Sequence, residues 1–200
     1  MKTFENRELP SAQRRSHPWT TTTADERHRY VDLRANPQLI PVVLEDFRPF
    51  AAEAAVRRFY ELIAWINGPE SPFESNDCAF TGPEANDEPG FAKRLQCSGR
   101  LGLLFRELSL NTSEPAVSRL IMGIHHALFD LEPDLAWGAV GTTRLAVHYR
   151  ALPPGEAAGS QVLISFWAWG DDEQELFHHL ARVVAALRDA LPRVASGMGR

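Results

Sequence analysis

Apolar residues recur every three or four positions between Phe47 and Ile66, with polar residues between them. This spacing is typical of an amphipathic helix that buries one side. Gly68 and Pro69 follow, and both residue types are common where a helix ends. The sequence therefore predicts a helix over 47–66.

Two further helices are predicted later in the chain. Ser113 is suited to cap the first of them, and its apolar stripe continues to Leu131. The second opens at Asp171 or Asp172, whose carboxylates can cap free N–H groups, and Pro192 is expected to end it.

Alternating apolar and polar residues predict strands over 95–106, 143–149 and 162–169. The last two are separated by a segment rich in proline and glycine, so they are expected to form a hairpin. The elements do not alternate regularly between strand and helix. We therefore predict an α+β fold, with a mostly antiparallel sheet of about four to five strands and three helices packed on one face.

Residues 1–28 are polar and show no apolar periodicity, which predicts a flexible N-terminal arm, and residues 29–200 are expected to form one α+β domain. The pair Arg14 and Arg15 is not followed by an apolar stretch, so no export signal is predicted and the expected location is the cytoplasm. No stretch approaches the roughly 20 apolar residues that would span a membrane.

Charge is distributed unevenly along the 200 residues, whose formal net charge is -5. Residues 1–30 contain six Lys or Arg against four acids, whereas residues 31–200 contain fifteen against twenty-two. A net negative body repels phosphate backbones and anionic lipid surfaces, so nucleic acid and membranes are not expected partners.

The segment between Pro69 and Gly90 contains six carboxylates and no Lys or Arg, and four prolines interrupt it. Because proline disrupts helices and central strands, the segment is predicted to be a surface loop that steers a basic protein partner. The same carboxylates could instead cover a basic face of the same molecule. They are Glu70, Glu74, Asp77, Glu84, Asp87 and Glu88.

Trp167 and Trp169 lie on the polar face of the predicted strand 162–169. Two tryptophans outside the core need either a cover, such as the N-terminal arm or a loop, or a partner that they anchor. With the carboxylates, they make up the predicted partner-binding surface. The most concrete function of this kind is that of a bacterial immunity protein, which neutralises a toxin by binding it and needs no catalytic group.

A different surface suggests an alternative function. If the predicted strands are neighbours, their polar sides place several cations near the two tryptophans, which fits a small anionic ligand or a single-stranded nucleic acid. The residues of this alternative site are Arg100, Arg106, Arg144, His148 and Arg150.

A second alternative is an enzyme that uses Cys78 as a nucleophile on the acidic loop. Nearby Glu74 and Asp77 would raise the thiol pKa, which disfavours this interpretation. The sequence has no phosphate-binding glycine loop, no GxSxG and no HExxH or CxxC, so no cofactor is predicted. The pairs His125–His126 and His178–His179 are adjacent on predicted helices and point apart, so no metal site is predicted either.

Overall fold

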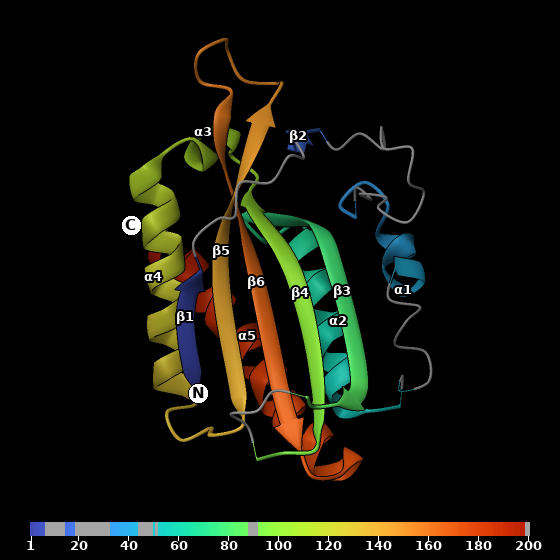
Figure 1. Cartoon of the computed structure of the whole chain (residues 1–200). Helices are drawn as coiled ribbons and strands as arrows, with labels where there is room; N and C mark the ends of the chain where they lie inside the picture. Colours follow the sequence, from blue (N-terminus) through green and yellow to red (C-terminus); the bar gives the residue numbers. More distant parts are fainter. Residues whose placement is uncertain (7–14, 19–32, 44–49, 51, 88–91, 199–200) are drawn as a thin grey trace.

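The computed structural model describes residues 1–6, 15–18, 33–43, 50, 52–87 and 92–198, and within them a six-stranded mixed sheet forms the centre of the molecule (Figure 1). The strand order is β1–β5–β6–β4–β3, and β2 also pairs with β5. The strands are β1 (Lys2–Asn6), β2 (Arg15–His17), β3 (Phe73–Ala85), β4 (Leu95–Phe105), β5 (Gly138–Tyr149) and β6 (Ala158–Gly170).

Three long helices pack on one face of the sheet; in Figure 1, two of them lie behind the strands and the third lies along the left edge, next to β1. Short helical turns complete the described part of the chain. The helices are η1 (Pro37–Leu39), α1 (Ile40–Val43), α2 (Ala54–Asn67), α3 (Leu108–Asn111), α4 (Glu114–Leu131) and α5 (Glu173–Met198).

The α+β prediction is confirmed, but the sheet is larger than predicted and is mixed. β1 and β2 run parallel to β5, whereas the pairs β3–β4, β4–β6 and β5–β6 are antiparallel. Two segments assigned to a flexible arm are therefore strands of the sheet, and the rest of 1–28, apart from the residues next to these strands, lies outside the described residues. The amino group of Met1 donates to the Pro133 carbonyl at 3.2 Å, which helps to hold β1 in place.

The acidic segment is a second correction, because residues 73–85 form strand β3 and not a loop. β3 is the last strand of the described sheet path and pairs with β4 alone, so a proline N atom on its outer side removes no ladder hydrogen bond. Register shifts between Ser75 and Cys78 and between Thr81 and Glu84 absorb the remaining irregularity.

The predicted helices 47–66 and 113–131 correspond to α2 and α4, and Ser113 accepts the N–H of Ala116 at 3.4 Å as the predicted cap. α2 begins at Ala54, and residues 47–49 lie outside the described residues. The prediction that Pro192 ends the last helix is wrong, since α5 continues to Met198. The turns beyond Pro192 remain packed against the body, since Val194 is buried and lies next to Gly123 of α4.

The main core lies between the sheet and the long helices, where the rings of Phe59 and Phe166 are 5.3 Å apart. A second, smaller apolar cluster lies on the helix-free face and consists of Leu104, Val147 and Tyr149. Apolar packing on both faces explains why the upper end of the sheet does not follow a simple alternation of buried and exposed sides.

Candidate functional site

Two acidic segments that are far apart in the sequence meet at one end of the sheet, the lower end in Figure 1. Ala85 of β3 pairs with Leu95 of β4, and Leu95 pairs with Gly170 of β6, so the end of β3 lies near the start of α5. We call this region the acidic end; it contains the carboxylates of Glu84, Asp87, Asp171, Asp172, Glu173 and Glu175 and the cations Lys93 and Arg94.

Lys93 is the main internal counter-charge of the acidic end. Its Nζ lies 2.8 Å from Asp171 Oδ2 and 2.7 Å from Glu175 Oε1, and 5.2 Å from the centre of the Trp137 ring. Its hydrogen bond holds the pKa of Glu175 below its usual range, and the bonds to Asp171 and Glu175 raise the pKa of Lys93. Arg94 donates to the Asp171 carbonyl at 2.7 Å. Asp171 and Glu175 are therefore partly neutralised within the molecule.

The carboxylates of Asp172 and Glu175 cap the start of α5. Asp172 Oδ1 accepts the Glu175 N–H at 2.8 Å, and Glu175 Oε2 accepts the Asp171 N–H at 2.7 Å. These bonds satisfy N–H groups at the helix start, and the negative charges oppose the positive end of the helix dipole.

Three carboxylates of the acidic end are exposed and do not cap α5, namely Glu84, Asp87 and Glu173. Glu84 accepts a side-chain hydrogen bond from Gln96 at 3.2 Å. Burial raises the pKa of Cys97 to about 12, and the charges of Glu84 and Glu173 add to that rise. Both carboxylates act on the same thiol, so they contribute to one local field.

The other predicted acids lie elsewhere or serve within the fold. Ten residues of strand separate Glu74 from Glu84, which is about 30 Å. Glu70 is exposed in the turn before β3. Glu74 accepts from His17 Nε2 at 2.9 Å and contacts Arg34 at 3.5 Å. The predicted acidic surface is therefore divided between two ends of β3; the Asp77 side chain and Glu88 lie outside the described residues.

The two tryptophans are not a pair of exposed anchors. Trp169 is buried, with 6% of its surface exposed. Trp167 is half-buried, and Phe4 of β1 stacks on its ring with the ring centres 5.7 Å apart. With Arg100 and Ser165, Trp167 lines a shallow hollow of about 150 Å³ on the helix-free face. The sequence predicted that Trp167 would be covered by another part of the chain or by a partner. Phe4 of the N-terminal strand β1 provides part of this cover.

The predicted basic face does not form, because β5 presents the opposite side from the one assumed. Arg144 and His148 share the face of Val140, whose partner Phe166 lies in the helix-covered core. Arg144 accordingly reaches Glu114 of α4, with which it forms an ion pair.

The remaining predicted cations have separate partners. Arg106 donates to the carbonyls of Gly68 and Phe73, the latter at 2.8 Å, and so joins the end of α2 to β3. Arg150 donates to the Pro18 carbonyl at 2.6 Å. Of the five, Arg100 alone lines the hollow beside Trp167 among the described residues. The alternative prediction was that the acidic segment covers Arg144 and Arg150. In the described chain, neither arginine forms an ion pair with a carboxylate of that segment.

Cys78 is buried in β3 next to Leu101 and belongs to the main core, with 7% of its surface exposed. A buried thiol is poorly placed to meet a substrate. The Cys78 alternative assumed a loop, and that premise is wrong.

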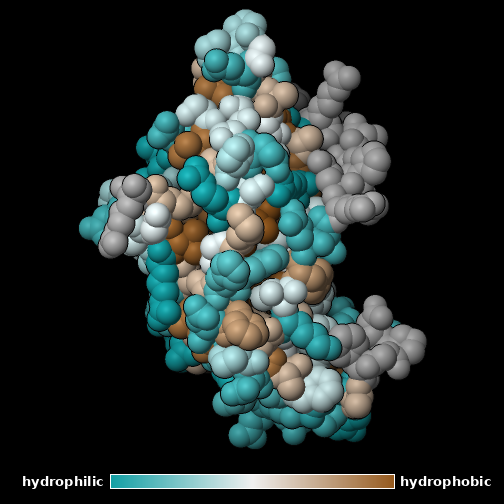
Figure 2. Space-filling view, turned by 90° about the vertical axis from the view of Figure 1, so that its left-hand side faces the viewer, coloured by the Kyte–Doolittle hydropathy of each residue, from teal (hydrophilic) through white to brown (hydrophobic). Residues whose placement is uncertain are grey.

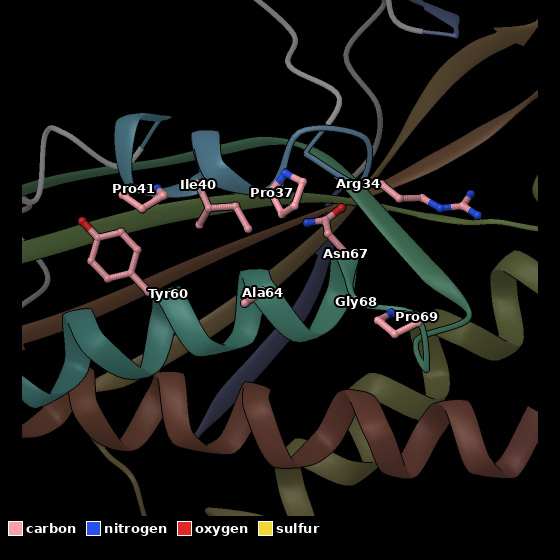
Figure 3. Close-up of a pocket in the computed structure, with 9 residues that line it drawn as sticks. All are labelled: Arg34, Pro37, Ile40, Pro41, Tyr60, Ala64, Asn67, Gly68 and Pro69. Atoms are coloured by element: carbon pink, nitrogen blue, oxygen red, sulfur yellow. The ribbon is translucent and has the colours of Figure 1, made fainter.

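A cavity of about 580 Å³ lies between the segment 33–43 and α2 (Figure 3). Figure 3 shows the rings of Pro37 and Pro41 and the side chain of Ile40 opposite Tyr60 and Ala64, while the Arg34 side chain points away. The lining consists of Arg34, Pro37, Ile40, Pro41, Tyr60, Ala64, Asn67, Gly68 and Pro69. No local sequence pattern predicts this cavity, because it arises where two segments distant in the sequence pack imperfectly.

In the described part of the chain, no three His, Cys, Asp or Glu side chains gather in a way that could hold a metal ion. None of the described helices has the length and apolarity needed to cross a bilayer. No protein-family model matches the chain, and comparisons with curated proteins and with solved structures also find no match.

Proposed function

We propose that this chain is a non-enzymatic binding protein that engages a basic protein partner through the acidic end of its sheet. The observation that carries the proposal is the convergence of the β3 end and the α5 start, which gathers six carboxylates around Lys93 and Arg94, while Arg58 and Arg182 line a hollow beside Glu173. Lys93 is enclosed between two of those carboxylates, with 13% of its side chain exposed, so its charge is directed mainly at Asp171 and Glu175.

A concentrated negative field raises the rate at which a positively charged protein arrives and orients it on arrival. Glu84, Asp87 and Glu173 would make the direct contacts, because their exposed carboxylates are not used to cap α5. The rigid sheet end and helix start would hold these groups in place, so that little ordering is required on binding.

The more specific form of the proposal is a bacterial immunity protein that neutralises a toxin by covering a cationic active-site cleft. Such an inhibitor works through a complementary surface and needs no reactive group. The toxin would then be a protein whose cleft binds an anionic substrate, for example a nuclease.

The proposal can be tested by capturing partner proteins from a lysate of the organism whose genome encodes this chain and identifying them by mass spectrometry. The wild-type chain is compared with a triple variant that carries Glu84→Lys, Asp87→Lys and Glu173→Lys. We expect a basic protein to be retained by the wild type and lost by the variant, and its affinity to fall steeply with added salt.

A matched control carries the same change of charge at Glu61, Glu107 and Glu156, which are exposed away from the acidic end. This control should retain the partner. If both triple variants capture the same proteins as the wild type, the acidic end is not the binding surface and the proposal fails.

The cavity in Figure 3 favours a second function, the binding of a small apolar molecule. Its volume lies within the range of ligand pockets, and its proline rings give it a preformed wall. Ala64→Trp would fill the space from α2. Titration with 8-anilinonaphthalene-1-sulfonate should show saturable binding to the folded wild type and at least a tenfold weaker interaction with the variant. Equal binding to both proteins would remove the cavity from consideration.

A further inference from the structure

The exposed side of α4 borders a groove of about 610 Å³ that runs between this helix and the C-terminal turns of α5. Gly123 and Ala127 of α4 and Val194 of α5 line it. Gly123 allows the close approach, since a Cβ there would lie 3.2 Å from Cγ1 of Val194. Figure 2 looks onto this side of the molecule and shows apolar groups, in brown, among polar ones.

Two large apolar side chains are exposed on one flank of α4. Met122 is 52% exposed and Phe129 is 61% exposed. They are seven residues apart, which places them on nearly the same side of a helix, two turns from each other. An apolar flank of this kind is more than a single scattered surface residue and suggests a covering partner.

The exposed side of α4 has a positive charge toward one end of the helix and a negative charge toward the other. Arg119 lies toward its N-terminal end and Asp130 toward its C-terminal end, about 16 Å apart along the axis. Neither residue forms an ion pair with another residue of the described chain. Arg193 of α5, which lines the same groove, has no ion-pair partner there either.

This arrangement is self-complementary under a twofold rotation. An axis that passes α4 midway between Ile124 and His125 places Arg119 opposite the partner's Asp130, and the converse pair forms at the other end. Antiparallel helices pack like flank against like flank, so Met122 lies beside the partner's Phe129. A parallel pair would instead set Arg119 against the partner's Arg119, which like-charge repulsion disfavours.

We propose that two copies of this chain associate through antiparallel packing of α4, with the Arg119–Asp130 pairs at both ends of the interface. The groove beside Gly123 and Ala127 gives the second helix room to approach. Such an interface is isologous and closes as a dimer, so it does not propagate into a filament. It uses none of the residues of the acidic end and is independent of the proposed function.

Sedimentation equilibrium of the full chain, from about 1 μM to 1 mM, tests the proposal over the range in which weak interfaces associate. We expect a concentration-dependent dimer. Arg119→Glu and Asp130→Arg should each weaken it at least tenfold, because each creates like charges at both ends of the interface. Mixing the two single variants should restore dimerisation, since the mixed pair again has opposite charges at both ends.

The control Arg57→Glu reverses an exposed charge on α2 and should leave the dimer unchanged. Circular dichroism of each variant checks that the helices are intact. A chain that stays monomeric at all concentrations overturns the proposal. This remains true even if the groove binds a helix of another protein, because the proposed partner is a second copy of this chain. Dimerisation that is insensitive to both reversals, or that the mixture fails to restore, overturns it as well.

Discussion

His17 Nε2 lies 2.9 Å from Glu74 Oε1, so a residue of β2, which pairs with β5, contacts β3 at the far end of the strand order. The contact requires the upper end of the sheet to curve over its helix-free face, around the cluster that contains Leu104 and Tyr149. The His17 ring also lies 5.7 Å from that of Tyr149. A short N-terminal strand thus joins the two sides of the sheet.

We predict that His17→Ala lowers the free energy of unfolding by about 1.5–3 kcal/mol, the range for a hydrogen bond to a charged group. Urea denaturation monitored by circular dichroism measures this change. Arg34→Ala provides the comparison, because Arg34 is 53% exposed and 3.5 Å from the same carboxylate, and it should have less than half the effect. Equal effects would mean that the His17 contact does not hold β2.

Gly99→Ala is expected to destabilise the fold by about 1–3 kcal/mol through overpacking. A Cβ at this position would lie 2.2 Å from Cζ of Phe166, whose ring is buried in the core. Thermal unfolding should show a clear decrease in Tm. In a double-mutant cycle, Phe166→Leu should relieve part of the strain, so the double variant is more stable than the sum of the single effects implies.

Gly197→Ala is the matched control, since among the described residues nothing outside its own stretch of helix lies within 4 Å of the added Cβ. It should change stability by no more than about 0.5 kcal/mol or slightly increase it, as Ala favours helix. A Gly99→Ala variant as stable as this control would show that β4 can shift away from Phe166.

Burial holds the pKa of His125 below its usual range, with the charge of Glu5 opposing this shift. The unfolded chain therefore takes up a proton at higher pH than the folded chain. The stability contributed by neutral His125 is present above the unfolded pKa of about 6.5 and is lost as the pH falls below it.

His125→Gln removes this titration and retains a polar group near Thr142 Oγ1, which lies 3.1 Å from His125 Nε2. We expect the free energy of unfolding to fall less between pH 7 and pH 5 in the variant than in the wild type. This pH range is chosen because the unfolded histidine takes up its proton at about pH 6.5. Parallel pH profiles would contradict the assignment to His125.

Both thiols should be inert in the folded protein. Burial raises the pKa of Cys97 to about 12, so this thiol is protonated at about pH 8, and Cys78 is enclosed by the core. Ellman's reagent should label neither rapidly before unfolding and both after it. Rapid labelling that Cys78→Ser abolishes would reopen the hypothesis of a reactive cysteine.

Local patterns predicted the long helices and the hairpin of β5 and β6, each of which buries one side. The stripe that ends at Leu131 and the cap at Ser113 correspond to α4, and the alternation over 162–169 corresponds to β6. They misplaced β3, because the prolines that exclude a central strand do not exclude a strand at the edge of a sheet. They also reversed the face of Arg144, because alternation shows that two sides differ but not which of them meets the helices.

Residue type and short spacing were enough to establish the α+β class, the three long helices apart from their exact ends, and the acidic character of two separate segments. Only the folded chain shows that the two segments converge at one end of the sheet, that Trp169 is buried while Phe4 covers Trp167, and that a cavity opens beside α2. Strand order, register and curvature bring these residues together. They result from the packing of the whole chain, which no local pattern contains.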